Sequence, residues 1–244
     1  MRTGHAVTAS AVIAAIMLLT GVTIATLRAA ESASVDHGVE LSELSPVVDN
    51  PHVGFGSLKR AVYTGRDRDS DTGKTSKIRM EVTVRDTAVM LVGIKVMVLD
   101  ILDFQDEVQI EAKRNYYAQD KAGGVYCLAE HVDDVVDGKV VGHDGQWTAG
   151  EKGAKAGFVM PPAPKVGDVF EPERAPGIAR DRSKVVAVGK TVKVAAGTFT
   201  GCIETESFDP IEKTSQRRIY APGVGLVKES SPERTIELAS RETR

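Results

Sequence analysis

Apolar and polar residues alternate along most of the chain from Lys59 onward. Residues 78–85 read IRMEVTVR, and residues 107–113 repeat the same period of two. This period places side chains alternately on the two faces of a strand, one of which is buried. Residues 94–104 are more continuously apolar, which is typical of a strand covered on both faces. The pattern predicts further strands at 125–129, 184–194, 198–207, 217–220, 225–229 and 234–238.

Turn residues separate these segments. Asp137-Gly138 lies between two apolar runs and is a strong signal for a two-residue hairpin. Pro222-Gly223, within YAPGVG, predicts a type II turn, because proline presets the first dihedral and glycine supplies the positive φ. The same glycines do not form a phosphate-binding loop, since LVKE continues as a strand and the third glycine of that motif is missing.

No segment after residue 50 carries apolar residues at helical spacing over three turns. Regularly spaced strands without intervening helices indicate antiparallel pairing rather than βαβ units. We therefore predict a mainly β fold, an antiparallel and strongly curled sheet or incomplete barrel of about ten strands. An N-terminal apolar helix precedes it.

This N-terminal segment is an uncharged apolar run at 6–27, between Arg2 and Arg28. A positive start followed by an apolar stretch and small residues is an export signal. The run is longer than the core of a cleaved signal and long enough to span a membrane, so cleavage and anchoring both stay open. We predict a signal peptide or signal anchor at 1–30, a linker at 31–50 and a β domain at 51–244. The domain is then extracytoplasmic, either periplasmic or secreted, with an inner-membrane anchor at 6–27 if the leader is retained.

Charge and cysteine content narrow the function classes. The chain has 31 basic and 34 acidic residues and no clustered basic surface, which argues against nucleic-acid binding. Cys127 and Cys202 are the two cysteines. In an oxidising compartment they form either one disulfide or two buried free thiols, and the sequence leaves both open.

Four phrases carry a family resemblance: NYYAQDKAGGVY, WTAGEKGAKAGFVMPPAPKVGD, GTFTGCIETE and IYAPGVGLVKE. Over 115–229 the chain resembles a widespread group of exported bacterial β-proteins of unknown function. The resemblance implies a sheet curled like that of periplasmic lipoprotein carriers, and no established reaction. Asn115 and Tyr116 stand where the group has Asp-Trp, and Cys127 replaces an aromatic residue. If an activity depended on that Asp, these departures count against it here.

Metal and nucleophile motifs are weak. Asp67, Asp69 and Asp71 alternate as in a calcium loop, but the glycine and the glutamate that such a loop requires are missing. On a regular strand Cys127 would face the same side as His131 and Asp133. Four residues of strand nevertheless separate Cys127 from His131 by roughly 13 Å. That is too far for a nucleophile–base pair. We expect no metal and no cofactor.

Acidic residues offer an enzymatic alternative. Asp100, Asp103, Asp106 and Glu107 gather around one predicted strand end, and Asp144 lies in a later loop. Paired carboxylates perform acid–base chemistry when their surroundings separate their pKa values. These residues support an extracytoplasmic hydrolase as the alternative function, although a solvated hairpin turn explains the first four equally well.

The segment 147–168 is the most informative loop, because it lacks a strand pattern and contains the only tryptophan and three prolines. Ordered loops of this length are usually functional. We predict a non-enzymatic envelope protein that binds a hydrophobic ligand, such as a lipid or apolar small molecule, or a partner protein within the curl. A structural subunit of a membrane assembly is a further alternative, and the loop could simply seal the core. The candidate binding residues are Trp147, Phe158, Met160, Tyr117 and Tyr220.

Overall fold

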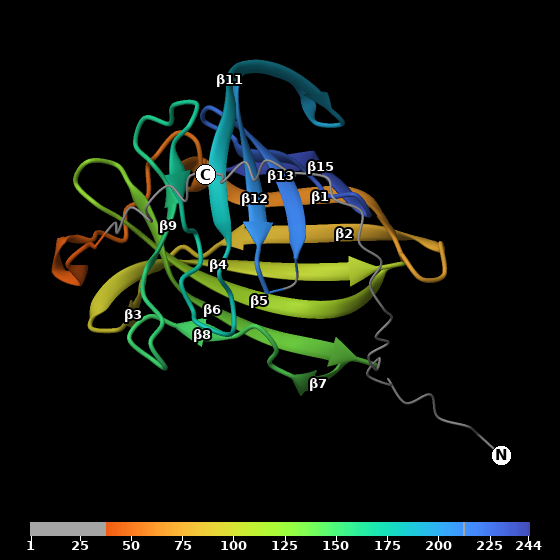
Figure 1. Cartoon of the computed structure of the whole chain (residues 1–244), viewed down its shortest axis with the longest axis horizontal. Coiled ribbons are helices and arrows are strands. Elements are labelled where there is room, and N and C mark those ends of the chain that lie inside the picture. The colour runs from red at the N-terminus through yellow and green to blue at the C-terminus, as the bar shows by residue number, and fades with distance from the viewer. Residues whose placement is uncertain (1–37, 212) are drawn as a thin grey trace, which may run out of the picture. The chain divides into compact units, whose positions relative to one another are not determined.

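A computed structural model describes residues 38–211 and 213–244, and within them the chain is almost entirely β-structure (Figure 1). Fifteen strands form one antiparallel sheet. Their bounds are β1 Leu58–Arg68, β2 Thr75–Val84, β3 Val89–Leu91, β4 Ile94–Gln105, β5 Val108–Gln119, β6 Val125–Val136, β7 Lys139–Gly142, β8 Trp147–Thr148, β9 Gly157–Met160, β10 Val169–Phe170, β11 Arg182–Val194, β12 Gly197–Asp209, β13 Thr214–Ala221, β14 Gly225–Ser230 and β15 Arg234–Thr243. Two short 3₁₀ turns, η1 Leu41–Glu43 and η2 Phe55–Ser57, precede them.

The predicted antiparallel β class is confirmed, but the predicted number of strands is too low. The main path runs β10-β11-β12-β13-β14-β15-β1-β2-β4-β5-β6-β7, and the sheet is not closed. Strands β3, β8, β9 and β10 account for most of the difference, since each has four residues or fewer. A period of two is not detectable in so short a run.

The N-terminal prediction falls mostly outside the described residues. The apolar helix and the signal or anchor at 1–30 belong to the undescribed residues 1–37. Among the residues that are described, no helix has the length and apolar character needed to cross a membrane. Residues 44–50 lie against β5, with Leu44 and Val48 buried and Ser45 paired to Gln119. The domain boundaries stay a prediction.

The sheet folds back on itself. In Figure 1, β11, β12 and β13 run across β2, β4 and β5. The backbone N–H of Ala196, after β11, donates to the carbonyl of Leu238 on β15 at 3.0 Å. At the other end of the path, the N–H of Phe158 on β9 donates to the carbonyl of Glu171 at 2.7 Å. These bonds join strands that are distant along the sheet, so the curled shape is stabilised from both ends.

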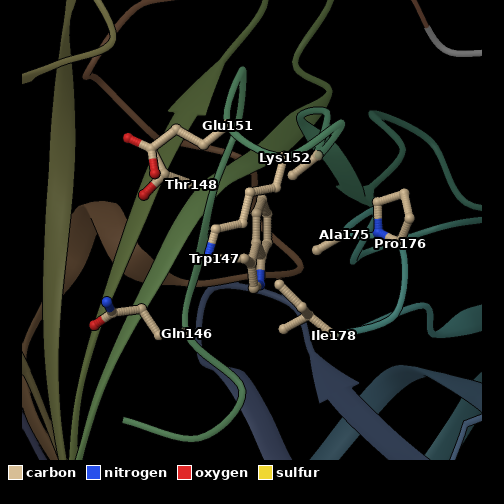
Figure 2. Close-up of a pocket in the computed structure, with 9 residues that line it drawn as sticks. Gln146, Trp147, Thr148, Glu151, Lys152, Ala175, Pro176 and Ile178 are labelled. Atoms are coloured by element: carbon tan, nitrogen blue, oxygen red, sulfur yellow. The ribbon is translucent and has the colours of Figure 1, made fainter.

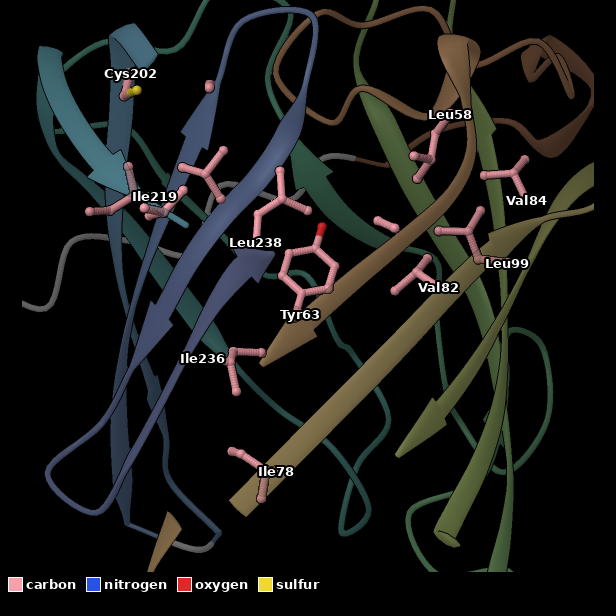
Figure 3. Close-up of a cluster of buried hydrophobic side chains, with 14 residues drawn as sticks. Leu58, Tyr63, Ile78, Val82, Val84, Leu99, Cys202, Ile219, Ile236 and Leu238 are labelled. Atoms are coloured by element: carbon pink, nitrogen blue, oxygen red, sulfur yellow. The ribbon is translucent and has the colours of Figure 1, made fainter. Parts of the chain in front are cut away.

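Apolar side chains fill part of the inner face of this curl, which we define as the face carrying Tyr63, Val82, Leu99 and Asn115. Figure 3 shows Tyr63, Val82, Leu99 and Leu238 converging from β1, β2, β4 and β15. Leu99 and Leu238 are almost fully buried. Each such leucine contributes about 1.5–3 kcal/mol through burial. This cluster has more members than any other group of buried apolar residues in the described part of the chain.

The YAPGVG segment is a turn, as predicted. The N–H of Val224 donates to the carbonyl of Ala221 at 3.0 Å, and Gly223 has a φ of 71°. Gly225 has a φ of 91°, and a Cβ there would overlap the carbonyl oxygen of Val53. The N–H of Gly223 also donates to the carbonyl of Pro51 at 2.8 Å. The turn therefore anchors the chain that enters β1.

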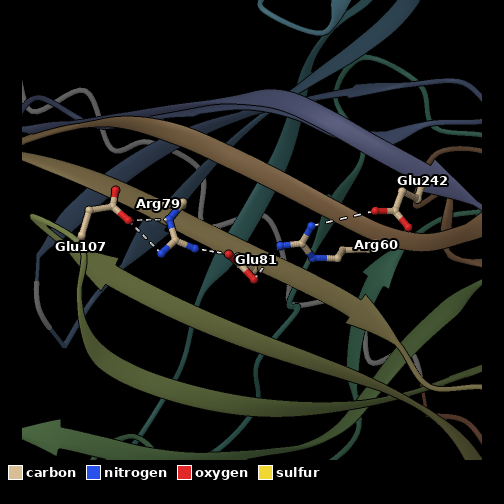
Figure 4. Close-up of polar contacts among 5 residues, drawn as sticks. All are labelled: Arg60, Arg79, Glu81, Glu107 and Glu242. Atoms are coloured by element: carbon tan, nitrogen blue, oxygen red, sulfur yellow. Dashed lines mark hydrogen bonds and ion pairs between the residues drawn. The ribbon is translucent and has the colours of Figure 1, made fainter. Parts of the chain in front are cut away.

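The outer face carries a ladder of alternating charges (Figure 4). Glu81 on β2 lies between Arg60 of β1, at 2.8 Å, and Arg79 of its own strand. Arg79 pairs in turn with Glu107 at 3.0 Å, and Arg60 with Glu242 of β15 at 4.0 Å. The ladder connects neighbouring strands on the face opposite to the core.

Candidate functional site

Trp147 lies in a small cavity beside the inner face of the sheet. It belongs to β8, opposite Glu130 of β6, and its side chain is 3% exposed. The cavity has a volume of about 70 Å³. Figure 2 shows the indole between Thr148 and Glu151 on one side and Ala175 and Ile178 on the other. The complete lining is Gln146, Trp147, Thr148, Glu151, Lys152, Ala154, Ala175, Pro176 and Ile178.

The structure separates the other predicted binding residues. Tyr117 borders the Trp147 cluster and packs on Phe55, with ring centroids 5.0 Å apart. Phe158 packs instead against Tyr126 in a different core cluster. Met160 and Tyr220 meet in a third cluster with Val48, Val125 and Ile203. Tyr117 packs on this third cluster as well, so it borders both Trp147 and the Met160–Tyr220 pair, whereas Phe158 packs in a separate cluster.

The segment 147–168 is an edge structure rather than a loop without strands. Strands β7, β8 and β9 pair one after another with β6, at its residues 134–136, 129–130 and 125–127. Gly157 on β9 has no room for a side chain because the carbonyl of Pro172 lies against it. The segment after β10 can therefore approach β9, and its Ala175 packs in the same cluster as Trp147.

Ionisable side chains occupy inner-face positions next to this cavity. Lys113 of β5 lies 2.8 Å from Asp103 of β4 and also pairs with Glu111. Asp103 is only 6% exposed, and Arg234 of β15 lies 3.7 Å from its second oxygen. Asn115, the next inner-face residue of β5, is paired in register with Glu130. The inner face is thus apolar toward one end and ionic toward the other.

Arg218 of β13 provides the opposite side of this ionic region. Its Nε donates to Glu229 at 2.7 Å and its Nη2 to Gln216 at 2.6 Å, while Asp181 lies 3.9 Å from Nη1. The side chains of Arg218 and Glu229 are 23% and 17% exposed. Burial opposes ionisation of Glu229, yet the adjacent guanidinium outweighs burial and lowers the pKa of this carboxyl. The pair is therefore ionic at neutral pH.

Glu130 and Glu173 also belong to this region, and each carboxyl influences the pKa of the other. Burial, followed by the charges of Glu130 and Asp181, raises the pKa of Glu173 to about 8, although Arg218 opposes the shift. Burial also raises the pKa of Glu130, against the charge of Lys113. Both carboxyls therefore hold their protons to higher pH than carboxyls in water.

Several polar atoms of this region have no hydrogen-bond partner. Among the described residues, six buried side-chain atoms are without one, and four of these lie here. They are Asp103 Oδ1, Asn115 Oδ1, Trp147 Nε1 and Arg234 Nε. A buried donor or acceptor of this kind costs about 1–3 kcal/mol if nothing binds it. The region can therefore form further hydrogen bonds with a polar group.

The acids predicted for a hydrolase do not converge. Asp100 points to the outer face and binds Arg85 at 2.7 Å. Asp106 and Glu107 form the exposed β4–β5 turn, and Asp144 is exposed as well. Only Asp103 lies in the ionic region. Sequence reasoning missed Glu130, Glu173, Asp181, Arg218 and Glu229. The sequence carries one sign of such a region, namely a charged residue at a position that the alternation assigns to the apolar face. Asp103, which follows Leu99 and Ile101 at intervals of two, is an example.

The predicted shared face of Cys127 and His131 is wrong, because a bulge shifts the register of β6. Cys127 packs with Trp147 on the inner face, whereas His131 contacts the outer-facing Tyr116 at 3.0 Å. Burial raises the pKa of the Cys127 thiol, which disfavours the reactive thiolate. Cys127 and Cys202 are both free and buried in separate clusters, so the alternative of two free thiols holds here and not the disulfide.

The predicted calcium residues shape a hairpin tip. Asp69 Oδ1 accepts hydrogen bonds from the N–H groups of Asp71 and Thr72 and from the Thr72 hydroxyl. Asp67 lies on β1, opposite Ser76 and Arg234. In the described part of the chain, no three acidic, histidine or cysteine side chains are grouped as metal ligands. The Asp69 carboxylate thus stabilises the turn.

Two solved structures are similar to this chain. One is a protein of Bacteroides fragilis described as exported with a YmcC-like fold, at 13% identity and a TM-score of 0.44 over 76% of this chain and 99% of that one. The other is described as a lipoprotein of Parabacteroides distasonis, at 11% identity and a TM-score of 0.37 over 77% and 98%. No protein-family model and no curated protein matches the chain. The comparisons name no activity.

Proposed function

We propose that the chain is an extracytoplasmic, non-enzymatic binding protein whose cavity at Trp147 takes one apolar side chain of a partner protein. The observation that carries this proposal is a buried indole N–H without an acceptor, beside a cavity with an apolar floor. Ala154, Ala175 and Ile178 contribute that floor. A partner that inserts an aliphatic side chain would bring backbone carbonyls close enough to accept from Nε1. The location outside the cytoplasm rests on the apolar run at 6–27.

Cavity size favours a protein side chain over a lipid. Small-molecule sites measure roughly 300–1,000 Å³, and an engineered cavity of about 150 Å³ binds benzene. The Trp147 cavity has about 70 Å³, room for a small aliphatic group. A lipid in the middle of the curl would also have to displace the ion pairs of Asp103, Lys113 and Arg218. Both arguments favour the partner-surface form of the predicted function.

The indole N–H of Trp147 is the direct reporter for a test, because the chain has one tryptophan. Titration with N-acetyl-leucinamide to about 20 mM, a concentration suited to weak binding, should shift the single indole resonance. N-acetyl-glutamate amide should not shift it. Ala175→Leu fills the cavity and should abolish the response.

A control separates binding from stability. Phe158→Leu weakens a different core cluster and should lower the melting temperature while the indole response persists. An unchanged indole resonance with the leucine derivative, or a response retained in Ala175→Leu, would refute the proposal.

A hydrolase is the second candidate, and the Glu130–Glu173 pair is the observation that favours it. One protonated and one ionised carboxyl side by side can act as acid and base. Neither carboxyl lines the Trp147 cavity, so we prefer the binding function. Turnover of model esters or glycosides that disappears in Glu173→Gln would reverse this preference.

A further inference from the structure

The lining of the Trp147 cavity includes a positive charge that the described part of the protein leaves unpaired. Two charged side chains line the cavity, Glu151 and Lys152, and both residues are exposed. Within the described ranges, the Lys152 ammonium forms no hydrogen bond and no ion pair. An ammonium group has three donors and no acceptor. It can therefore bind an anionic group that reaches the cavity.

Glu151 does not provide this anionic group. Figure 2 shows Glu151 next to Thr148, whereas Lys152 lies alongside the indole of Trp147. The hydroxyl of Thr148 lies 3.4 Å from Nε2 of His131, a residue of the outer face of β6. Glu151 is thus on the side of the cavity that leads to the outer face. Lys152 supplies the charge beside the indole.

A hydrogen-bonded turn fixes the position of Lys152. The N–H of Glu151 donates to the carbonyl of Thr148 at 3.1 Å, and the N–H of Ala154 donates to the carbonyl of Glu151 at 2.8 Å. Lys152 has a φ of 47°. This left-handed conformation disfavours every residue that has a Cβ, so glycine would fit the backbone better than lysine does. The turn nevertheless presents a lysine to the cavity.

The groups around the cavity define the chemistry of a ligand. Trp147 is 3% exposed and its Nε1 has no acceptor, and Lys152 adds a second donor with a positive charge. Ala154, Ala175 and Ile178 supply the apolar floor. A carboxylate offers two acceptor oxygens and a negative charge, and charge-assisted hydrogen bonds are stronger than neutral ones. The matching ligand is therefore an aliphatic group that carries a carboxylate.

We propose that the cavity recognises the C-terminal residue of the partner protein, whose aliphatic side chain enters the cavity and whose terminal carboxylate binds Lys152 and the indole N–H of Trp147. The proposal rests on the proposed function, because it identifies the part of the partner that enters the same cavity. An internal residue would present only a neutral carbonyl, which leaves the charge of Lys152 unpaired. Capture of a C-terminal carboxylate is a recurrent mode of peptide recognition.

N-acetyl-leucine and N-acetyl-leucinamide test the proposal, since they differ in whether the terminal group is a carboxylate or a neutral amide. Titrations followed by the indole resonance of Trp147 at low ionic strength should give a dissociation constant roughly three- to fivefold lower for N-acetyl-leucine. This advantage should disappear in Lys152→Gln and shrink in about 0.5 M NaCl. Lys155→Gln removes an exposed lysine that does not line the cavity and should retain the advantage.

Lys152→Gly separates the loss of binding from a loss of stability. Glycine adopts positive φ freely, so this variant should melt no lower than the wild type. It should nevertheless lose the preference for the carboxylate. A preference that survives in Lys152→Gly would contradict the role of the ammonium.

The outcomes distinguish this inference from the proposed function. Equal dissociation constants for the two leucine derivatives in the wild type, or an advantage that is unchanged in Lys152→Gln, would overturn the inference, while the binding of leucinamide would still support the function. N-acetyl-glycine has the carboxylate without the side chain and should bind at least about tenfold more weakly than N-acetyl-leucine. If it binds as tightly, the carboxylate binds without the cavity, and both proposals fail. Both also fail if neither leucine derivative shifts the resonance.

Discussion

At the scale of single residues, adjacent positions on one strand have different roles. Arg217 and Arg218 are neighbours on β13, so their side chains point to opposite faces of the sheet. Arg217 is 54% exposed and pairs with Glu206 at 3.3 Å, whereas Arg218 is 23% exposed and binds Glu229 at 2.7 Å. An ion pair in water contributes little to stability, but the loss of one partner from a buried pair leaves a charge uncompensated.

Arg218→Met should therefore lower the free energy of unfolding by roughly 3 kcal/mol, mainly through the unpaired Glu229. Arg217→Met should cost less than about 1 kcal/mol. Urea denaturation of both variants at neutral pH measures the difference. Equal losses in the two variants would show that the ionic region contributes no more than a surface pair.

At the scale of strands, the outer ladder connects β1, β2 and β15 through charges that alternate across the sheet (Figure 4). Glu81 is its central member, 20% exposed and bound to both Arg60 and Arg79. Glu242 is a terminal member, 56% exposed and 4.0 Å from Arg60. Arg79 additionally lies 3.8 Å above the ring of Phe104. The ladder combines cross-strand ion pairs with a cation–π contact.

Removing the central charge should cost more than removing the terminal one. Glu81→Gln should lower the free energy of unfolding by about 1 kcal/mol at low ionic strength, because two guanidinium groups then lack their common carboxylate. The loss should shrink in about 0.5 M NaCl, where such charges are screened. Glu242→Gln should stay within about 0.3 kcal/mol. Thermal melts at both salt concentrations provide the comparison, and equal effects of the two variants would contradict the argument.

At the scale of the molecule, contacts between distant segments hold the curl. The turn at 221–225 contacts residues 51–54, although more than a hundred residues separate them in the chain. Gly54 and Gly225 approach each other so closely that neither position has room for a Cβ. The other end of the curl depends on β9 and residues 171–174, which meet across the edge of β6.

Gly225→Ala and Gly223→Ala distinguish backbone conformation from close contact. Both glycines have positive φ, but no atom lies within 4 Å of a Cβ at Gly223, whereas a Cβ at Gly225 overlaps the Val53 carbonyl. Gly223→Ala should cost about 1 kcal/mol, the penalty for a left-handed alanine. Gly225→Ala should cost at least about twice as much, because the entry segment must also move. Denaturant unfolding measures both, and similar costs would mean that the 51–54 contact adds no stability.

Much of the fold was predictable because it depends on local pattern. The long strands, the Asp137-Gly138 hairpin and the Pro222-Gly223 turn each follow from neighbouring residues alone. The short strands β8 and β9 were missed, since pairing with β6 and not their own sequence makes them strands. The prediction that Cys127 and His131 lie on one face was wrong for a related reason. The bulge in β6 belongs to its pairing with β5, which the sequence of β6 alone does not show.

The sequence alone determined which long segments become strands, since alternation of apolar and polar residues is a property of the chain itself. It also identified Trp147 as a residue to examine. Only the tertiary structure decided that Glu130, Glu173 and Arg218 meet, because they lie on β6, a connecting segment and β13. Charge interactions depend on distance and burial, and a sheet that curls brings together residues whose separation along the chain gives no sign of contact.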